Sequence, residues 1–184
     1  MPDVPSPVVA KQIDVTYLTD EDRLLLTVRG SEGSCAFWLT RRLCSGLLKG
    51  LADILTRTSS LLSRAPSDSR TQILMFEHAE ALLRQNAAGA PGEAPALRAP
   101  VEPSPNNTVH LVQIIDLSAK GDTIRFSLLA GGICYAVLPL SRDNAHQLAG
   151  MLFNKAQHAG WALDDCAWID CRSQVILPVG TSPN

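Results

Sequence analysis

Apolar and polar side chains alternate along three short stretches near the start of the chain. Ile13 and Val15 alternate with polar neighbours in residues 11–18, and residues 23–29 and 34–39 repeat the pattern. Polar or glycine-containing turns separate the three stretches. Alternation with a period of two is typical of strands that are buried on one face. The pattern therefore predicts an antiparallel meander of three strands.

The apolar period changes to that of a helix after this meander. Thr40 is the predicted N-cap, because its hydroxyl oxygen can accept a backbone N–H of the first helical turn. Four leucines then form a helical stripe, which three further apolar residues widen: Leu43, Leu47, Leu51 and Leu55, with Leu48, Ile54 and Leu62 beside them. Gly46 and Gly50 lie on a neighbouring face. Their lack of a side chain predicts close packing of this helix on a sheet.

A second helix is predicted over residues 69–86, after the break at Pro66. The residues near its buried face are Leu74, Met75, His78, Leu82 and Gln85. We expect His78 to be a hydrogen-bonded histidine at a helix–helix contact, with a role as ligand or base as the alternative.

The same plan recurs after a linker over residues 87–107, where five prolines forbid a continuous helix. Strands are predicted over 108–117, 123–129 and 133–138. A helix then begins after Ser141 and ends at Gly160. A last strand, predicted over 173–179, has no counterpart in the first half.

The repeated order predicts an α+β fold of two related strand–strand–strand–helix halves about a pseudo-twofold axis. The helices are expected on one side of either one continuous sheet or two packed sheets. An extra helix follows the first half, and an extra strand ends the second. The predicted organisation, from a loose N-terminal tail to a short C-terminal one, divides the chain at 1–10, 11–86, 87–107, 108–180 and 181–184.

Composition indicates a globular protein, with 46% hydrophobic and 18% charged residues. The net charge of -2 argues against a strongly electrostatic nucleic-acid binder. The five cysteines are read as free thiols of a reducing compartment. No signal-peptide pattern opens the chain, and no apolar run reaches the ~20 residues that span a bilayer. We therefore expect a soluble, cytoplasmic protein without a membrane partner.

Motifs for catalysis or cofactor binding are missing from the sequence. No glycine-rich loop joins a strand to a helix, and there is no Gly-x-Ser-x-Gly elbow. Cys166 and Cys171, with His158 upstream, are the only metal-like group, but zinc sites usually have a second close pair of ligands. A disulfide between these two cysteines is the alternative. No cofactor and no metal are predicted.

Arginines near the ends of the predicted elements are the best candidate contact residues. Arg41, Arg42 and Arg142 fall in the first turns of helices, where a cation opposes the helix dipole. Either an intramolecular carboxylate or an acidic partner, such as a phosphate, would offset this cost. Arg29 and Arg125 lie at outward strand positions. Trp38 stands on the outer side of an otherwise inward-facing strand.

The order of antiparallel strands followed by a helix, present twice, resembles that of single-stranded-DNA-binding folds of the Whirly type. Those folds have four strands in each unit, whereas three are predicted here. The resemblance implies binding of single-stranded DNA or RNA through outer strand faces that combine arginine with an aromatic side chain.

The leading hypothesis is a non-enzymatic interaction protein, an accessory or assembly subunit that binds a partner protein. Trp38 is its candidate anchor residue. The alternative is a nucleic-acid-binding module that uses Arg29, Trp38, Arg41, Arg42, Arg125 and Arg142. A third hypothesis is an enzyme or metal protein around His158, Cys166 and Cys171. Unpaired edge strands also make a second copy of the chain a candidate partner.

Overall fold

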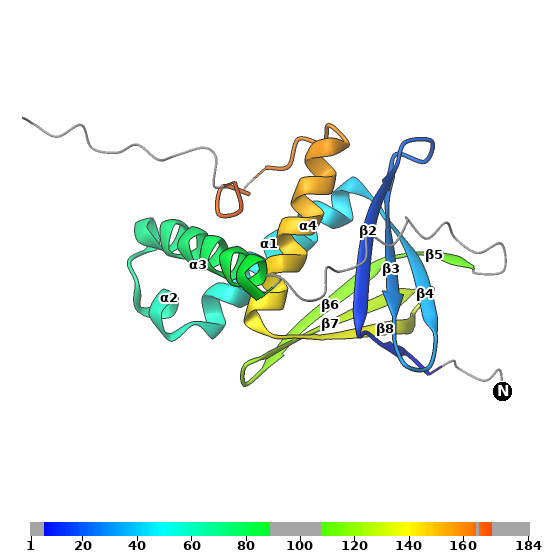
Figure 1. The fold of residues 1–184 in the computed structure, drawn as a ribbon, viewed down its shortest axis with the longest axis horizontal. Helices are drawn as coiled ribbons and strands as arrows, with labels where there is room; N and C mark the ends of the chain where they lie inside the picture. Colours follow the sequence, from blue (N-terminus) through cyan, green and yellow to red (C-terminus); the bar gives the residue numbers. More distant parts are fainter. Residues whose placement is uncertain (1–5, 89–107, 165, 171–184) are drawn as a thin grey trace, which may run out of the picture.

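The computed structural model describes residues 6–88, 108–164 and 166–170, which form an α+β fold of two four-stranded sheets and four helices (Figure 1). One sheet has the order β2-β3-β4-β5, and the other has the order β1-β8-β7-β6. The strands of the two sheets run across one another, and the helices gather at one side of both (Figure 1). The predicted fold class is confirmed, with two sheets rather than one.

The first meander matches its prediction closely. Its strands are β2 (Gln12–Leu18), β3 (Arg23–Arg29) and β4 (Ser34–Leu39), joined antiparallel. Helix α1 (Arg41–Thr58) begins where the hydroxyl of Thr40 accepts the N–H of Leu43, as expected. It ends four residues before Leu62, which belongs instead to the short helix α2 (Ser60–Arg64).

The second meander consists of β6 (Ile114–Lys120), β7 (Thr123–Ala130) and β8 (Ile133–Leu140). Gly131 and Gly132 both have positive φ, as the tight turn between β7 and β8 requires. Helix α4 (Arg142–His158) starts at the Ser141 cap, and Gly160 follows its end with φ of 68°. The predicted final strand over 173–179 lies outside the described residues.

Each meander is preceded by a short strand that belongs to the other sheet. Strand β1 (Val8–Val9) pairs in parallel with β8, and β5 (Val109–Leu111) pairs in parallel with β4. The chain crosses between sheets at Ala10, whose N–H bonds to Val137 of one sheet, while the next N–H bonds to Arg29 of the other. The reverse crossing occurs at Val112 and Gln113. The N–H of Val112 bonds to the carbonyl oxygen of Trp38, and the N–H of Gln113 bonds to that of Leu129.

This exchange corrects two predictions. The expected tail over 1–10 contains β1, and the single strand expected over 108–117 is divided into β5 and the start of β6. The reason is that a strand can bend and pass from one sheet to another without losing its extended pattern. Gly30 permits the approach of β1, because a Cβ there would collide with the carbonyl oxygen of Val9. The pseudo-twofold relation stays a prediction, although a reciprocal exchange is what it would produce.

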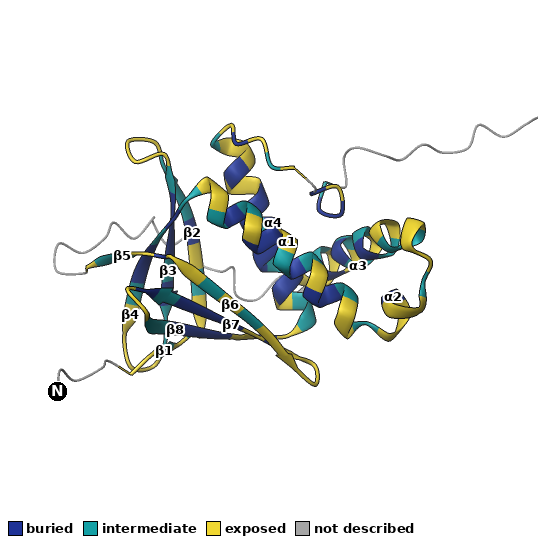
Figure 2. Cartoon of the chain, turned by 180° about the vertical axis from the view of Figure 1, so that it is seen from behind, coloured by how far each residue is buried: buried dark blue, intermediate teal, exposed yellow. Residues whose placement is uncertain are grey.

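Apolar side chains of both sheets and all four helices form one core (Figure 2). Each long helix of a meander packs on the opposite sheet, α1 on β6 and α4 on β2. Gly50 fulfils its predicted role, because a Cβ there would lie 2.8 Å from the Cδ1 of Leu117 on β6. The same expectation for Gly46 was wrong, since a Cβ there would have no neighbouring atom within 4 Å.

The turn between β2 and β3 is tied to the segment after α4. Asp22 accepts hydrogen bonds from the indole N–H of Trp161 at 3.0 Å and from the hydroxyl of Tyr17 at 2.9 Å. These bonds hold the pKa of Asp22 below its usual value. Trp161 and Trp168 are both buried.

The extra helix predicted after the first half is α3 (Ser67–Ala88), which packs on α4 and α1. It is two residues longer at each end than its prediction, so the segment expected as a linker from residue 87 begins later. No helix among residues 6–88, 108–164 and 166–170 is long and apolar enough to cross a bilayer.

Candidate interaction surface

Arg142 is a structural residue that joins three helices. Its guanidinium donates to the carbonyl oxygen of Leu55 at 2.8 Å, to the hydroxyl of Thr58 at 3.0 Å and to a carboxylate oxygen of Glu77 at 2.5 Å. The side chain therefore closes the C-terminal end of α1, where carbonyl groups lack helical partners. An intramolecular carboxylate thus offsets the dipole cost of this cation, which was one of the two possibilities raised by the sequence.

The other predicted contact residues are distributed over β3, β4, β7 and the start of α1. Arg41 donates to the carbonyl oxygen of Ala162 at 2.8 Å, and Arg29 lies 3.8 Å from the carboxylate of Asp14. Arg42 is exposed in the first turn of α1, and Arg125 is exposed on β7. The structure therefore does not bring the six residues together as one cluster, and three of the five arginines have partners within the chain.

Trp38 is half-buried on the outer face of the β2-β3-β4-β5 sheet. Its neighbours across the strands are Leu25 on β3 and Leu111 on β5. The adjacent residues Phe37 and Leu39 belong to the core, and side chains alternate along a strand, so Trp38 points away from it. A short apolar row thus crosses this outer face.

The third hypothesis finds little geometric support. His158 is exposed at the end of α4, Cys166 is buried, and Cys171 lies outside the described residues. Within the part of the chain that the structure describes, no three His, Cys, Asp or Glu residues are placed to hold a metal ion.

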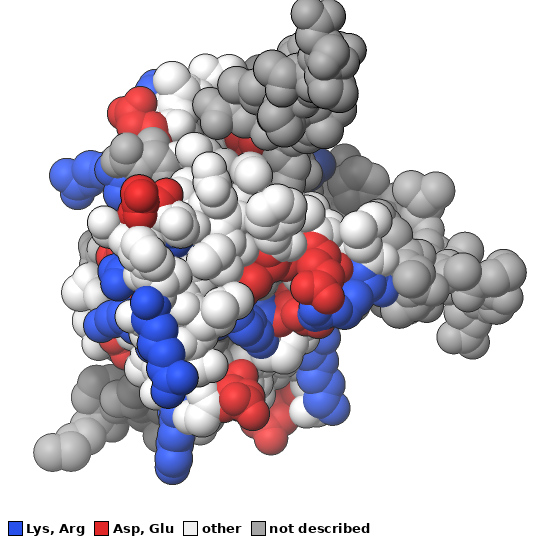
Figure 3. Space-filling view, turned by 90° about the vertical axis from the view of Figure 1, so that its left-hand side faces the viewer, with Lys and Arg blue, Asp and Glu red and all other residues white. Residues whose placement is uncertain are grey.

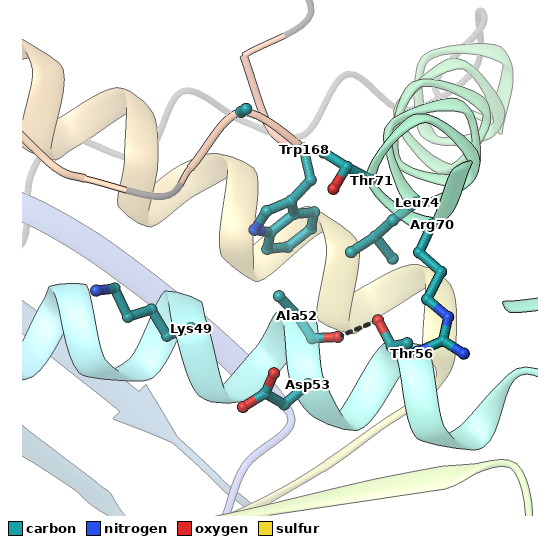
Figure 4. Close-up of a pocket in the computed structure, with 9 residues that line it drawn as sticks. Lys49, Ala52, Asp53, Thr56, Arg70, Thr71, Leu74 and Trp168 are labelled. Carbon is teal, nitrogen blue, oxygen red and sulfur yellow. Dashed lines mark hydrogen bonds between the residues drawn. The ribbon is translucent and has the colours of Figure 1, made fainter. Parts of the chain in front are cut away.

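A cavity of about 500 Å³ lies between α1 and α3 (Figure 4). The ring of Trp168 stands between the two helices, with Leu74 pointing toward it and Ala52 below (Figure 4). Several polar groups of the rim have other partners: the hydroxyl of Thr56 donates to the carbonyl of Ala52 and the Nε of Arg70 to that of Ala65. The cavity has an apolar floor suited to an apolar side chain, and its lining offers no paired nucleophile and base among the described residues.

Among the large apolar side chains of the described residues, the two most exposed lie on α3. Phe76 is 70% exposed and Leu83 is 67% exposed. They are seven residues apart, which places them on one helix face about 10 Å apart along the axis. At 100° per residue this face is opposite the buried one that carries Leu74 and His78. We call Phe76 and Leu83 the α3 stripe.

Charged groups beside the α3 stripe neutralise one another. Arg84 lies 2.7 Å from the carboxylate of Asp143 and 2.7 Å from that of Glu80. Hydrogen bonds to Asp143, which has the larger effect, and to Glu80 hold the pKa of Arg84 above its usual value. Figure 3 looks onto the helical end of the molecule, where a patch of side chains other than Lys, Arg, Asp and Glu lies among groups of charged ones. Around Arg84, a partner would meet charges that already have partners within the chain.

The α3 stripe was not predicted from the sequence, although its spacing was visible there. The helix has apolar residues on both faces, and the sequence prediction uses only the face with Leu74 and His78. The signal that identifies the stripe is a large apolar pair at i and i+7 on the face opposite that one.

Comparison of the chain with protein-family models, with curated proteins and with solved structures gives no match.

Proposed function

We propose that this chain is a non-enzymatic interaction subunit that binds a partner protein through the α3 stripe. The observation that carries the proposal is the exposure of Phe76 and Leu83 on one face of a helix whose other face is anchored in the core. Large apolar side chains that gather on a surface mark interaction sites more reliably than single exposed ones. Aromatic side chains are also enriched among residues that dominate binding energy.

The chemistry of the stripe favours an amphipathic helix as partner. Two apolar side chains separated by two helical turns form a ridge, and ridges pack into the grooves of a second helix. The paired charges of Arg84, Glu80 and Asp143 leave little electrostatic selectivity, so the contact is mainly apolar. One helix face is smaller than a standard interface of ~800 Å² per partner, and we expect modest affinity.

A nuclease-treated pull-down from the native host tests the proposal with three baits. The wild type and the variant Ile114→Glu, which changes an exposed isoleucine on β6, should recover the same protein in stoichiometric amount. The double variant Phe76→Glu, Leu83→Glu should lose it, since charged side chains at the centre of an apolar contact are unfavourable. Equal recovery by all three baits would overturn the proposal.

A second copy of the chain is another protein that could cover the stripe. Sedimentation of the purified wild type and of the double variant, compared at several concentrations, distinguishes self-association from binding of a foreign partner. A concentration-dependent dimer that the double variant lacks identifies self-association.

The nucleic-acid alternative has one observation in its favour, the half-buried Trp38 on an outer sheet face with Arg29 on the neighbouring strand. Each half also supplies four strands and a helix in chain order, the number that Whirly-type folds have. The internal partners of Arg41 and Arg142 and the net charge of -2 weigh against it. Binding to short oligonucleotides that weakens steeply with salt would favour this alternative.

A further inference from the structure

Two buried histidines face each other between α3 and α4, beneath the α3 stripe. His78 on α3 and His146 on α4 are each 1% exposed, and their ring centroids are 5.5 Å apart. The indole of Trp168, in the segment after α4, contacts both rings edge-on at 5.6 Å and 6.0 Å. Helix α4 passes close to this packing at Gly150, where a Cβ would be in van der Waals contact with the Cε1 of His78 at 3.4 Å.

Four of the five ring nitrogens at this junction lack hydrogen-bond partners among the described residues. Nδ1 of His78, both ring nitrogens of His146 and Nε1 of Trp168 are buried without one. The prediction of a helix–helix contact for His78 is thus confirmed, but the expected hydrogen bond is not found at its Nδ1. A protonated imidazole needs acceptors for two N–H groups, and neither ring has both among the described residues.

We propose that His78, His146 and Trp168 form an acid-sensitive lock, in which protonation of the imidazoles releases α3 and the 166–170 segment from α4 before the two sheets unfold. The lock depends on the packing alone and does not rest on the proposed function. Its physical basis is that a buried cation without a counterion is strongly unfavourable, whereas the released histidines are hydrated.

Charged groups around the junction do not compensate a proton there. Glu77 on α3 lies 3.8 Å from Nε2 of His146, but Arg142 already binds that carboxylate. Arg142 and Arg84 oppose a charge on His146, whereas Asp143 and the shared carboxylate of Glu77 favour it. The segment after α4 contributes Cys166 and Asp170 as titratable groups, and α1 contributes Lys49 and Asp53 along the cavity beside Trp168.

Burial accordingly lowers the pKa of both histidines. Desolvation lowers the pKa of His78 to about 4, and desolvation together with His78 and Arg142 lowers that of His146 to about 3. At a pH below the ordinary histidine pKa of about 6.5, the closed state thus binds fewer protons than the released state. Closure is fully favoured above that pH and weakens as pH falls toward 4. Each histidine changes the released-to-closed ratio by about tenfold per pH unit in this window.

Hydrogen exchange of the full chain between pH 7 and 4, corrected for intrinsic rates, tests the lock. Opening of α3 in the wild type should increase by nearly a hundredfold per pH unit below about 6, because two protons are taken up. The amides of β3 and β7 should stay protected in the same window. His78→Gln and His146→Gln should each reduce the dependence to about tenfold per unit, and the exposed His158→Gln should leave it unchanged.

Three outcomes would overturn the lock. The first is opening of α3 that does not depend on pH beyond the intrinsic rates. The second is simultaneous opening of α3 and the strands, which would indicate a general loss of stability. The third is a pH dependence of α3 opening that is unchanged in both single histidine variants. The single variants are sufficient for this test, so it does not require a double variant that folds.

Discussion

Arg142 shows how a residue predicted to contact a partner can be needed inside the fold. The sequence places a cation in the first turn of a helix, where the dipole disfavours it. The structure supplies Glu77 and the carbonyl end of α1 as its partners. Both come from elements far away in the sequence, so the pattern indicated that a partner was needed without identifying it.

Replacement of Arg142 by methionine should destabilise the fold by about 2–4 kcal/mol. Methionine keeps the apolar stem but leaves the half-buried carboxylate of Glu77 and the carbonyl of Leu55 without this donor. Arg42→Met is the matched control, since Arg42 is exposed in the first turn of α1, and a surface change of this kind alters stability by no more than about 0.5 kcal/mol. Urea unfolding of both variants measures the difference. Equal stability of the two would contradict the role assigned to Arg142.

The elements themselves were largely predictable from local signals. The strands of the first meander, the caps Thr40 and Ser141 and the end of α4 at Gly160 depend on patterns of a few residues. Strand β5 was not separated from β6, and β1 was missed because it has only two residues and its partner, β8, belongs to the other half. Its existence depends on pairing between distant segments, which periodicity does not reveal.

The two glycines of α1 provide a test at the scale of one element. Gly46→Ala should stabilise the protein by about 0.5–1 kcal/mol, because alanine favours a helix and no atom lies within 4 Å of the new Cβ. Gly50→Ala should be less stable than Gly46→Ala by about 1 kcal/mol or more, since its Cβ would displace the side chain of Leu117. Thermal unfolding compares the two. The reverse order would show that α1 does not pack on β6 as described.

At the scale of the whole molecule, the two sheets and the helical layer differ in how they are held. The sheets exchange β1 and β5, so each half completes the sheet of the other. Helix α3 is attached through its packing on α4 and α1, with the Arg142–Glu77 pair and the buried histidines at the contact. The α3 stripe thus lies on the element that the proposed lock would release.

The candidate site was harder to predict than the fold, for a physical reason. Exposure is a property of the assembled molecule, and α3 carries apolar residues on two faces, only one of which can enter the core. Local periodicity offers no way to choose between them. Trp38, the predicted anchor, is instead half-buried in a row with Leu25 and Leu111.

The most direct test of the central claim is photo-crosslinking in the native host from single positions. Benzoylphenylalanine at Phe76 adds its benzoyl group to a side chain that is 70% exposed, and the same residue at Trp38 and at Ile114 reports on the outer faces of the two sheets. The account predicts one discrete protein adduct from position 76 and none from positions 38 and 114. An adduct with nucleic acid from position 38, together with no protein adduct from position 76, would contradict it.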